Sequence, residues 1–151
     1  PMNAELIAAW TRRVTGNDAV YILGDMFFRC NNPEPILKHL KGKKHLILGN
    51  HDGSWMTKGD FSHYFVSINN YLEVSDGTRG MTLCHYPLLS WKHAKTTYMI
   101  HGHIHANTDM DFWPLLKARD HVLNAGVDVN GYQPVTFDEL LENNIAFKTN
   151  H

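Results

Sequence analysis

The amino-acid sequence predicts an α/β fold with a mixed sheet arrangement, in one domain that spans residues 1–151. Three observations carry this prediction: short apolar runs bounded by turn residues, helical patterns near the first of these runs, and a hairpin signal in the middle of the chain. A chain of 151 residues is long enough to bury most of its apolar surface. Its 43% apolar and 19% charged residues are typical of a globular protein.

The N-terminal part predicts a helix followed by a strand. Four apolar residues recur at the spacing of one helical face: Leu6, Ile7, Trp10 and Val14. Turn-forming residues at 16–18 end this helix, and residues 19–23 then form a continuous apolar run that suits a buried strand. Residues 33–40 predict a short helix with proline in its first turn, and residues 45–48 predict the next strand. Strand, helix and strand in this order indicate a parallel βαβ unit.

The rest of the chain predicts further strands and one long helix. Residues 71–74 and 81–84 flank Asp76-Gly77, a turn signal between two antiparallel strands. Residues 97–100 and 121–124 predict two more short strands. Thr136 and Glu139 match a capping box that opens a last helix. We expect residues 144–148 to be a final extended segment.

Composition excludes several classes of protein. The formal net charge is −1 with acids and bases well mixed, which argues against a binder of long nucleic acid. No apolar run approaches the length of a membrane span, and no signal peptide is visible. The two cysteines match neither a disulfide scaffold nor a metal spacing, so we expect a reduced, cytoplasmic protein. Of the eleven histidines, we expect five to lie at the surface: His39, His63, His93, His121 and His151.

Four of the strand-like runs end in residues that bind divalent metals. These endings are Gly24-Asp25, Gly49-Asn50-His51-Asp52, His85 and Gly102-His103-Ile104-His105. This layout places oxygen and imidazole ligands on loops at one edge of a sheet, where a metal centre can gather them. Mixed oxygen and nitrogen ligands without thiolates suit Mn²⁺, Fe, Zn²⁺ or Co²⁺ better than a closed structural zinc site.

The order of these ligands indicates phosphoester hydrolysis. Gly-Asp and an isolated histidine are weak signals, Gly-His-x-His is moderate, and Gly-Asn-His-Asp after an apolar strand is strong. Two metal ions roughly 3.5–4 Å apart polarise phosphoryl oxygens and make hydroxide available near neutral pH. His51 lies beside the ligand Asn50 and is placed to give a proton to the leaving oxygen. Asp52 is a candidate for holding the His51 imidazole in one orientation.

The motifs resemble those of the calcineurin-like metallophosphoesterase superfamily, in particular its small bacterial or phage phosphoesterases. The resemblance rests on residues 20–25, 45–52, 84–88, 102–105 and 124–129. It implies a four-layer α/β/β/α sandwich with a dinuclear metal centre above the strand ends. It also implies that Asp25 is the bridging carboxylate and that Asn50, His85 and His103 complete one metal site. His105 would belong to the other metal, and His51 would be the acid near the leaving group.

The start of the sequence departs from the family pattern. The family normally opens with a strand that ends in Asp-x-His, and nothing before Asp25 matches it. We therefore expect a first strand missing relative to the family, an incomplete first metal site and weak activity. Three explanations are open. The chain is a version shortened by cloning or by a misassigned start, which Pro1-Met2 would fit; another chain fills the gap by strand exchange, as in a homodimer; or residues 144–148 take that place.

Arg29 and three tryptophans are weaker candidates. Arg29 follows Asp25 and is a candidate for binding a substrate phosphate, although a solvated loop arginine is equally compatible with the sequence. Trp55, Trp91 and Trp113 near the motif loops either stack on an aromatic leaving group or pack in the core, and packing is the more common role.

Two hypotheses for function follow. The first is a metal-dependent phosphoesterase that hydrolyses phosphomonoesters or phosphodiesters by metal-activated hydroxide. Its cofactor would be Mn²⁺ in the first place, with Fe, Zn²⁺, Co²⁺ or Ni²⁺ as alternatives, and its partner a small phosphoester or nucleotide-like substrate. The alternative is a catalytically impaired phosphoesterase-like module that binds other proteins. We expect neither a long nucleic acid nor a membrane as partner.

Overall fold

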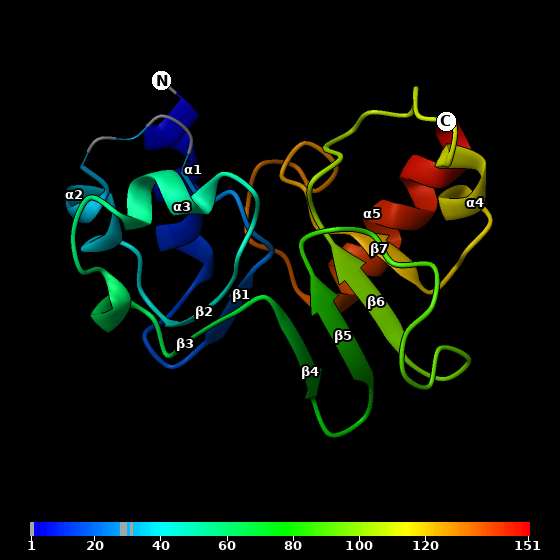
Figure 1. Ribbon diagram of the computed structural model, residues 1–151, viewed down its shortest axis with the longest axis horizontal. Helices are drawn as coiled ribbons and strands as arrows, with labels where there is room; N and C mark the ends of the chain where they lie inside the picture. The colour runs from blue at the N-terminus through cyan, green and yellow to red at the C-terminus, as the bar shows by residue number, and fades with distance from the viewer. Residues whose placement is uncertain (1, 28–29, 31) are drawn as a thin grey trace.

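The computed structural model describes residues 2–27, 30 and 32–151. Figure 1 shows two sheets, the first with the N-terminal helices beside it and the second with the C-terminal helices. The helices are α1 (Met2–Arg13), α2 (Glu34–Leu37), α3 (Asp52–Met56), α4 (Trp113–Lys117) and α5 (Phe137–Asn150), with a 3₁₀ turn, η1, at Ser62–Tyr64. The strands are β1 (Ala19–Ile22), β2 (Lys43–Ile47), β3 (Ser67–Asn69), β4 (Tyr71–Ser75), β5 (Gly80–Cys84), β6 (Tyr98–His101) and β7 (Val122–Asn124).

The first sheet is parallel and the second is mixed. The first has the order β1-β2-β3, with all its strands parallel. The second has the order β4-β5-β6-β7, in which β4 runs antiparallel to β5 and the other pairs are parallel. The parallel pairing of β1 and β2 across α2 confirms the predicted βαβ unit. The antiparallel pairing of β4 and β5 confirms the hairpin predicted from Asp76-Gly77.

Successive side chains of β2 belong to two different hydrophobic cores. Leu46 is fully buried against Trp55 and Phe65, on the helix-covered side of the first sheet. The next residue, Ile47, is also fully buried but packs with Leu83 and Ile100 of the second sheet. Successive side chains of a strand point to opposite faces, so the two sheets pack face to face through this second core. The molecule is therefore an α/β sandwich, as the sequence predicted.

A third core lies between the second sheet and the C-terminal helices. Met99 of β6 and Val122 of β7 pack there against Trp113 and Leu116 of α4. Phe147 of α5 adds to it from the other helix. Helices thus cover the second sheet on the side away from the first sheet, and the layers are helices, first sheet, second sheet and helices.

The expected extended segment at residues 144–148 is wrong, because these residues continue α5. The capping box at Thr136 and Glu139 opens this helix, as predicted. Asn144 is buried, and its amide both donates to the carbonyl of Asn124 and accepts from the Asn124 N–H, at 3.0 and 2.7 Å. These bonds tie α5 to β7, and tertiary contacts outweigh the weak helix propensity of asparagine. The tail is helical and so does not supply a strand to the first sheet.

The predicted helix at residues 33–40 is shorter in the structure, where α2 has four residues. Within the described residues, no helix is both long and apolar enough to cross a bilayer.

Candidate metal centre

The loops after β1 and β2 touch each other, and two glycines permit the contact. Gly24 has a φ of +91°, and a Cβ there would lie 2.4 Å from His85 Nδ1 and 2.8 Å from the Gly49 backbone. A Cβ on Gly49 would lie 2.4 Å from Asp25 Oδ1. Neither position has room for a side chain, so the Gly-Asp and Gly-Asn pairs in the sequence reflect backbone packing at the site.

Asp52 joins these two loops. Its side chain is fully buried, and Oδ2 accepts hydrogen bonds from the N–H groups of Asp25 and Gly49 at 2.8 and 2.7 Å. Oδ1 accepts from the N–H of Met26 at 2.9 Å and from Trp55 Nε1 at 2.8 Å. The carboxylate therefore fixes the backbone that carries Asp25. Orientation of the His51 imidazole by Asp52 stays a prediction.

His85 is oriented for metal binding by a backbone carbonyl. The imidazole is 2% exposed, and its Nδ1 lies 2.6 Å from the carbonyl oxygen of Leu23. A carbonyl only accepts, so Nδ1 carries the proton and donates it. In the neutral imidazole, the lone pair of Nε2 then points into the site.

Two oxygen acceptors lie close to Nε2 of His85, which is itself an acceptor in this tautomer. Asn50 Oδ1 lies 3.0 Å away and Asp25 Oδ2 lies 3.2 Å away. A lone pair and two oxygens at this separation repel one another unless a cation lies among them, either a proton on Nε2 or a metal ion. The donor set of carboxylate, amide oxygen and imidazole fits a divalent metal, so the residues present match the cofactor expected from the sequence.

His103 completes the group. Its ring centroid lies 5.0 Å from that of His85, and ligand atoms of Asp25, His85 and His103 all lie within 4.8 Å of one another. Partial desolvation lowers the pKa of His103, and the neighbouring His85 imidazole lowers it further. A lowered pKa favours the neutral imidazole, which is the form that binds metals.

The loop that carries His103 and His105 is strained, and residues outside the loop bond to its backbone. Both residues have positive φ values, 69° and 54°, a conformation that costs a non-glycine residue roughly 1–2 kcal/mol. Asn124 Nδ2 donates to the His105 carbonyl at 2.8 Å, and Asp128 Oδ2 accepts from the Ala106 N–H at 2.7 Å. The second Asp128 oxygen is buried and has no hydrogen-bond partner among the residues that the structure describes. Neither residue was predicted as part of the site, although both belong to the 124–129 motif that supported the resemblance.

The remaining predicted site residues differ in their positions. His51 is exposed, and its backbone N–H donates to Asp25 Oδ1 at 2.8 Å, which places it at the centre. His105 is exposed on the same loop as His103, but within the described ranges it does not join the group of three ligands. Arg29 lies outside the described residues.

Tyr86 is an aromatic residue at the centre that was not among the predicted site residues. Trp55 is fully buried in the first core, and Trp113 is 9% exposed in the third. Trp91 is half-buried and donates from Nε1 to Thr97 Oγ1. These three tryptophans thus have packing roles. The sequence feature that could have indicated Tyr86 is its position directly after His85.

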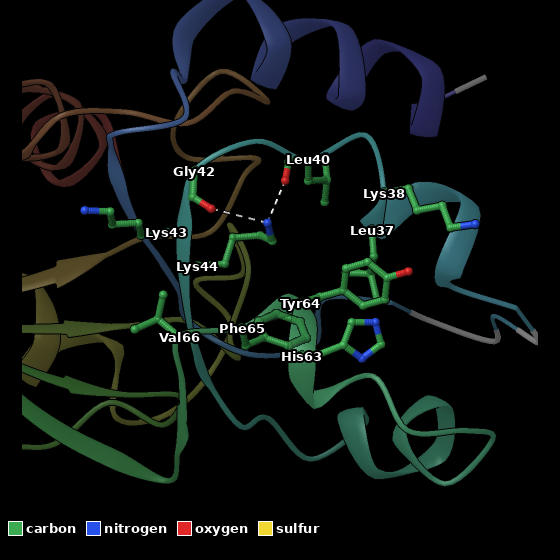
Figure 2. A pocket seen from close by; sticks show the side chains of 10 residues that line it. All are labelled: Leu37, Lys38, Leu40, Gly42, Lys43, Lys44, His63, Tyr64, Phe65 and Val66. Carbon is green, nitrogen blue, oxygen red and sulfur yellow. Dashed lines mark hydrogen bonds between the residues drawn. The ribbon is translucent and has the colours of Figure 1, made fainter.

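A cavity of about 440 Å³ lies away from the metal centre, at the amino end of β2 (Figure 2). Lys44 lines it, and its Nζ donates to the carbonyls of Leu40 and Gly42 at 2.6 and 3.4 Å. Burial lowers the pKa of Lys44. The candidate ligands lie at the carboxyl ends of the strands instead, so this lysine closes the loop before β2 and has no place in the metal site.

Comparison with known proteins agrees with the geometry. The family model described as calcineurin-like phosphoesterase matches residues 3–149. An uncharacterized protein of Methanocaldococcus jannaschii is 31% identical over 146 residues, which cover 93% of this chain and 74% of that protein. The crystal structure of a protein of unknown function from Aquifex aeolicus superposes with a TM-score of 0.68 at 24% identity, over 93% of this chain and 84% of that one. At that identity the structural likeness shows the fold alone.

Proposed function

Because the chain belongs to the calcineurin-like phosphoesterase family, we propose that it is a metal-dependent hydrolase of phosphomonoesters or phosphodiesters. The observation that carries the proposal is the convergence of Asp25, His85 and His103 within 4.8 Å, with the amide oxygen of Asn50 beside them. Carboxylate, amide and imidazole groups are the ligand types that divalent metals use in proteins.

Each residue has a proposed part in the reaction. Asp25, Asn50, His85 and His103 hold one divalent ion, Mn²⁺ in the first place. When bound, the metal supplies Lewis-acid polarisation of the phosphoryl oxygens and makes hydroxide available near neutral pH. His51, whose backbone is anchored to Asp25, donates a proton to the leaving oxygen. His105 is the proposed ligand of a second ion.

We propose slow turnover for this chain. The described residues contain a single group of three or more candidate ligands, so a second ion would be held weakly. Loss of one metal removes half of the clamp that stabilises attacking and leaving oxygens in two-metal hydrolysis.

The experiment is hydrolysis of bis(4-nitrophenyl) phosphate and 4-nitrophenyl phosphate with added Mn²⁺. We expect His51→Ala to lower the rate by about 10²–10⁴-fold, the usual contribution of general acid catalysis. Asn50→Ala should lower Mn²⁺ affinity as well as rate. His39→Ala, a change at another exposed histidine, should leave the rate unchanged. Equal residual rates in all four proteins would refute the proposed chemistry.

Calorimetric titration with Mn²⁺ distinguishes the phosphoesterase from the alternative, a binding module with the same fold. Two ions per chain support a full dinuclear enzyme, and one supports the slow enzyme proposed above. No binding at any concentration favours the module, because the imidazole and carboxylate groups would then serve only the fold.

A further inference from the structure

Tyr86 places an exposed aromatic ring against both histidine ligands. Its ring centroid lies 4.7 Å from that of His103 and 5.1 Å from that of His85, with interplanar angles of 64° and 77°. These are edge contacts, so the faces of the tyrosine ring are not stacked on the imidazoles. Tyr86 is 45% exposed, although its neighbour His85 is 2% exposed. An exposed tyrosine therefore lies directly beside the proposed metal ligands.

An exposed aromatic residue next to an ion site has a specific use in recognition. Ligand sites combine polar groups that fix one part of a ligand with aromatic surface that covers another part. At this centre, the candidate metal ligands are the polar groups, and Tyr86 is the aromatic group beside them. A group attached to a phosphate that is held by the centre would lie within reach of this ring.

We propose that Tyr86 is a specificity-determining residue, and that the centre prefers phosphoesters in which a flat aromatic group, such as an aryl ring or a nucleobase, lies close to the phosphorus. This inference rests on the proposed phosphoesterase function. Tyr86 makes its contact with the organic part of the substrate and none with the phosphoryl group. Its removal therefore changes discrimination between substrates and leaves phosphate recognition intact.

The experiment compares two non-hydrolysable probes, phenylphosphonate and methylphosphonate, which carry the same phosphonate group. Their dissociation constants are measured by calorimetry on the Mn²⁺-loaded protein. An aromatic pair contributes a preference of roughly 2- to 12-fold, so the wild type should bind phenylphosphonate more tightly by about that factor. Tyr86→Ala should bring the ratio of the two constants close to one, and Tyr86→Phe should keep it.

The matched control is Tyr21→Ala. Tyr21 is 38% exposed and stacks on the His45 imidazole at 4.7 Å, but His45 is not a candidate ligand. This variant should keep the wild-type ratio. A wild-type ratio of one, an unchanged ratio in Tyr86→Ala, or an equal loss of affinity for both probes in that variant would overturn the role of Tyr86. Absence of any phosphonate binding to the wild type would overturn the phosphoesterase proposal as well.

Discussion

Replacing Asp52 with asparagine should destabilise the protein strongly, although the two side chains have nearly the same shape. The buried carboxylate accepts four hydrogen bonds, two on each oxygen. An amide keeps one oxygen but turns the other acceptor into an NH₂ donor. That donor would face two N–H groups, either those of Asp25 and Gly49 or those of Met26 and the Trp55 indole.

The size of the effect follows from these contacts. A hydrogen bond to a charged group is worth about 1.5–3 kcal/mol, and Asp52→Asn removes two of them. We therefore expect the free energy of unfolding to fall by roughly 3–6 kcal/mol, a large part of the 5–15 kcal/mol typical of a domain. Mn²⁺ affinity should fall at the same time, because in either orientation one lost bond holds the backbone N–H of Asp25 or of its neighbour Met26.

The measurement is urea denaturation without metal, followed by Mn²⁺ titration of the folded variant. Asp60→Asn is the matched control, since the exposed Asp60 accepts its hydrogen bonds from the N–H and the hydroxyl of its near neighbour Ser62, at 3.1 and 2.7 Å. We expect it to change stability by less than about 1 kcal/mol. If Asp52→Asn were as stable as Asp60→Asn, the Asp52 carboxylate would not be the group that holds the two loops together.

Three further predictions concern the metal ligands and the helices. Asp128→Ala should weaken Mn²⁺ binding by about 10- to 100-fold in calorimetry, because it frees the loop after His105; unchanged affinity would show that the loop needs no such support. Addition of Mn²⁺ at 100 times its dissociation constant should raise unfolding free energy by about 2.7 kcal/mol in the wild type and not in His85→Ala, and an equal rise in both would exclude His85 as a ligand. Burial lowers the pKa of Lys148 to about 8, so the unfolded chain binds its proton more tightly than the folded one between about pH 8 and 10.5. Stability should therefore rise with pH across that window more in the wild type than in Lys148→Met, as followed by urea denaturation at each pH.

The strands that carry ligands were predictable because their signals are local. Residues 19–23 and 45–48 are continuous apolar runs, and the parallel βαβ rule then places Asp25 and Asn50 at one sheet edge. β3 escaped prediction, since Ser67-Ile68-Asn69 has no apolar run and is recruited by pairing with β2. Residues 144–148 were predicted wrongly because the buried Asn144 bonds to a strand that lies far away in the sequence.

The candidate site divides in the same way. Asp25, His85 and His103 were predicted from their places at strand ends, and the structure brings them together. Tyr86 and Asp128 depend on tertiary neighbours, namely two imidazoles and the Ala106 backbone, which no local pattern encodes. The roles of His51, Asp52 and His105 in catalysis stay predictions.

The candidate ligands come from both halves of the sandwich: Asp25 and Asn50 follow strands of the first sheet, and His85 and His103 follow strands of the second. A small slide of one sheet across the other would separate the two pairs, even if no loop changed its own conformation. We therefore expect metal affinity to report on the alignment of the two sheets. Substitutions deep in the shared core, such as Ile47→Val or Leu83→Ala, should alter it without touching a ligand. A bound ion, in turn, would resist that slide and make the two sheets behave mechanically as one body.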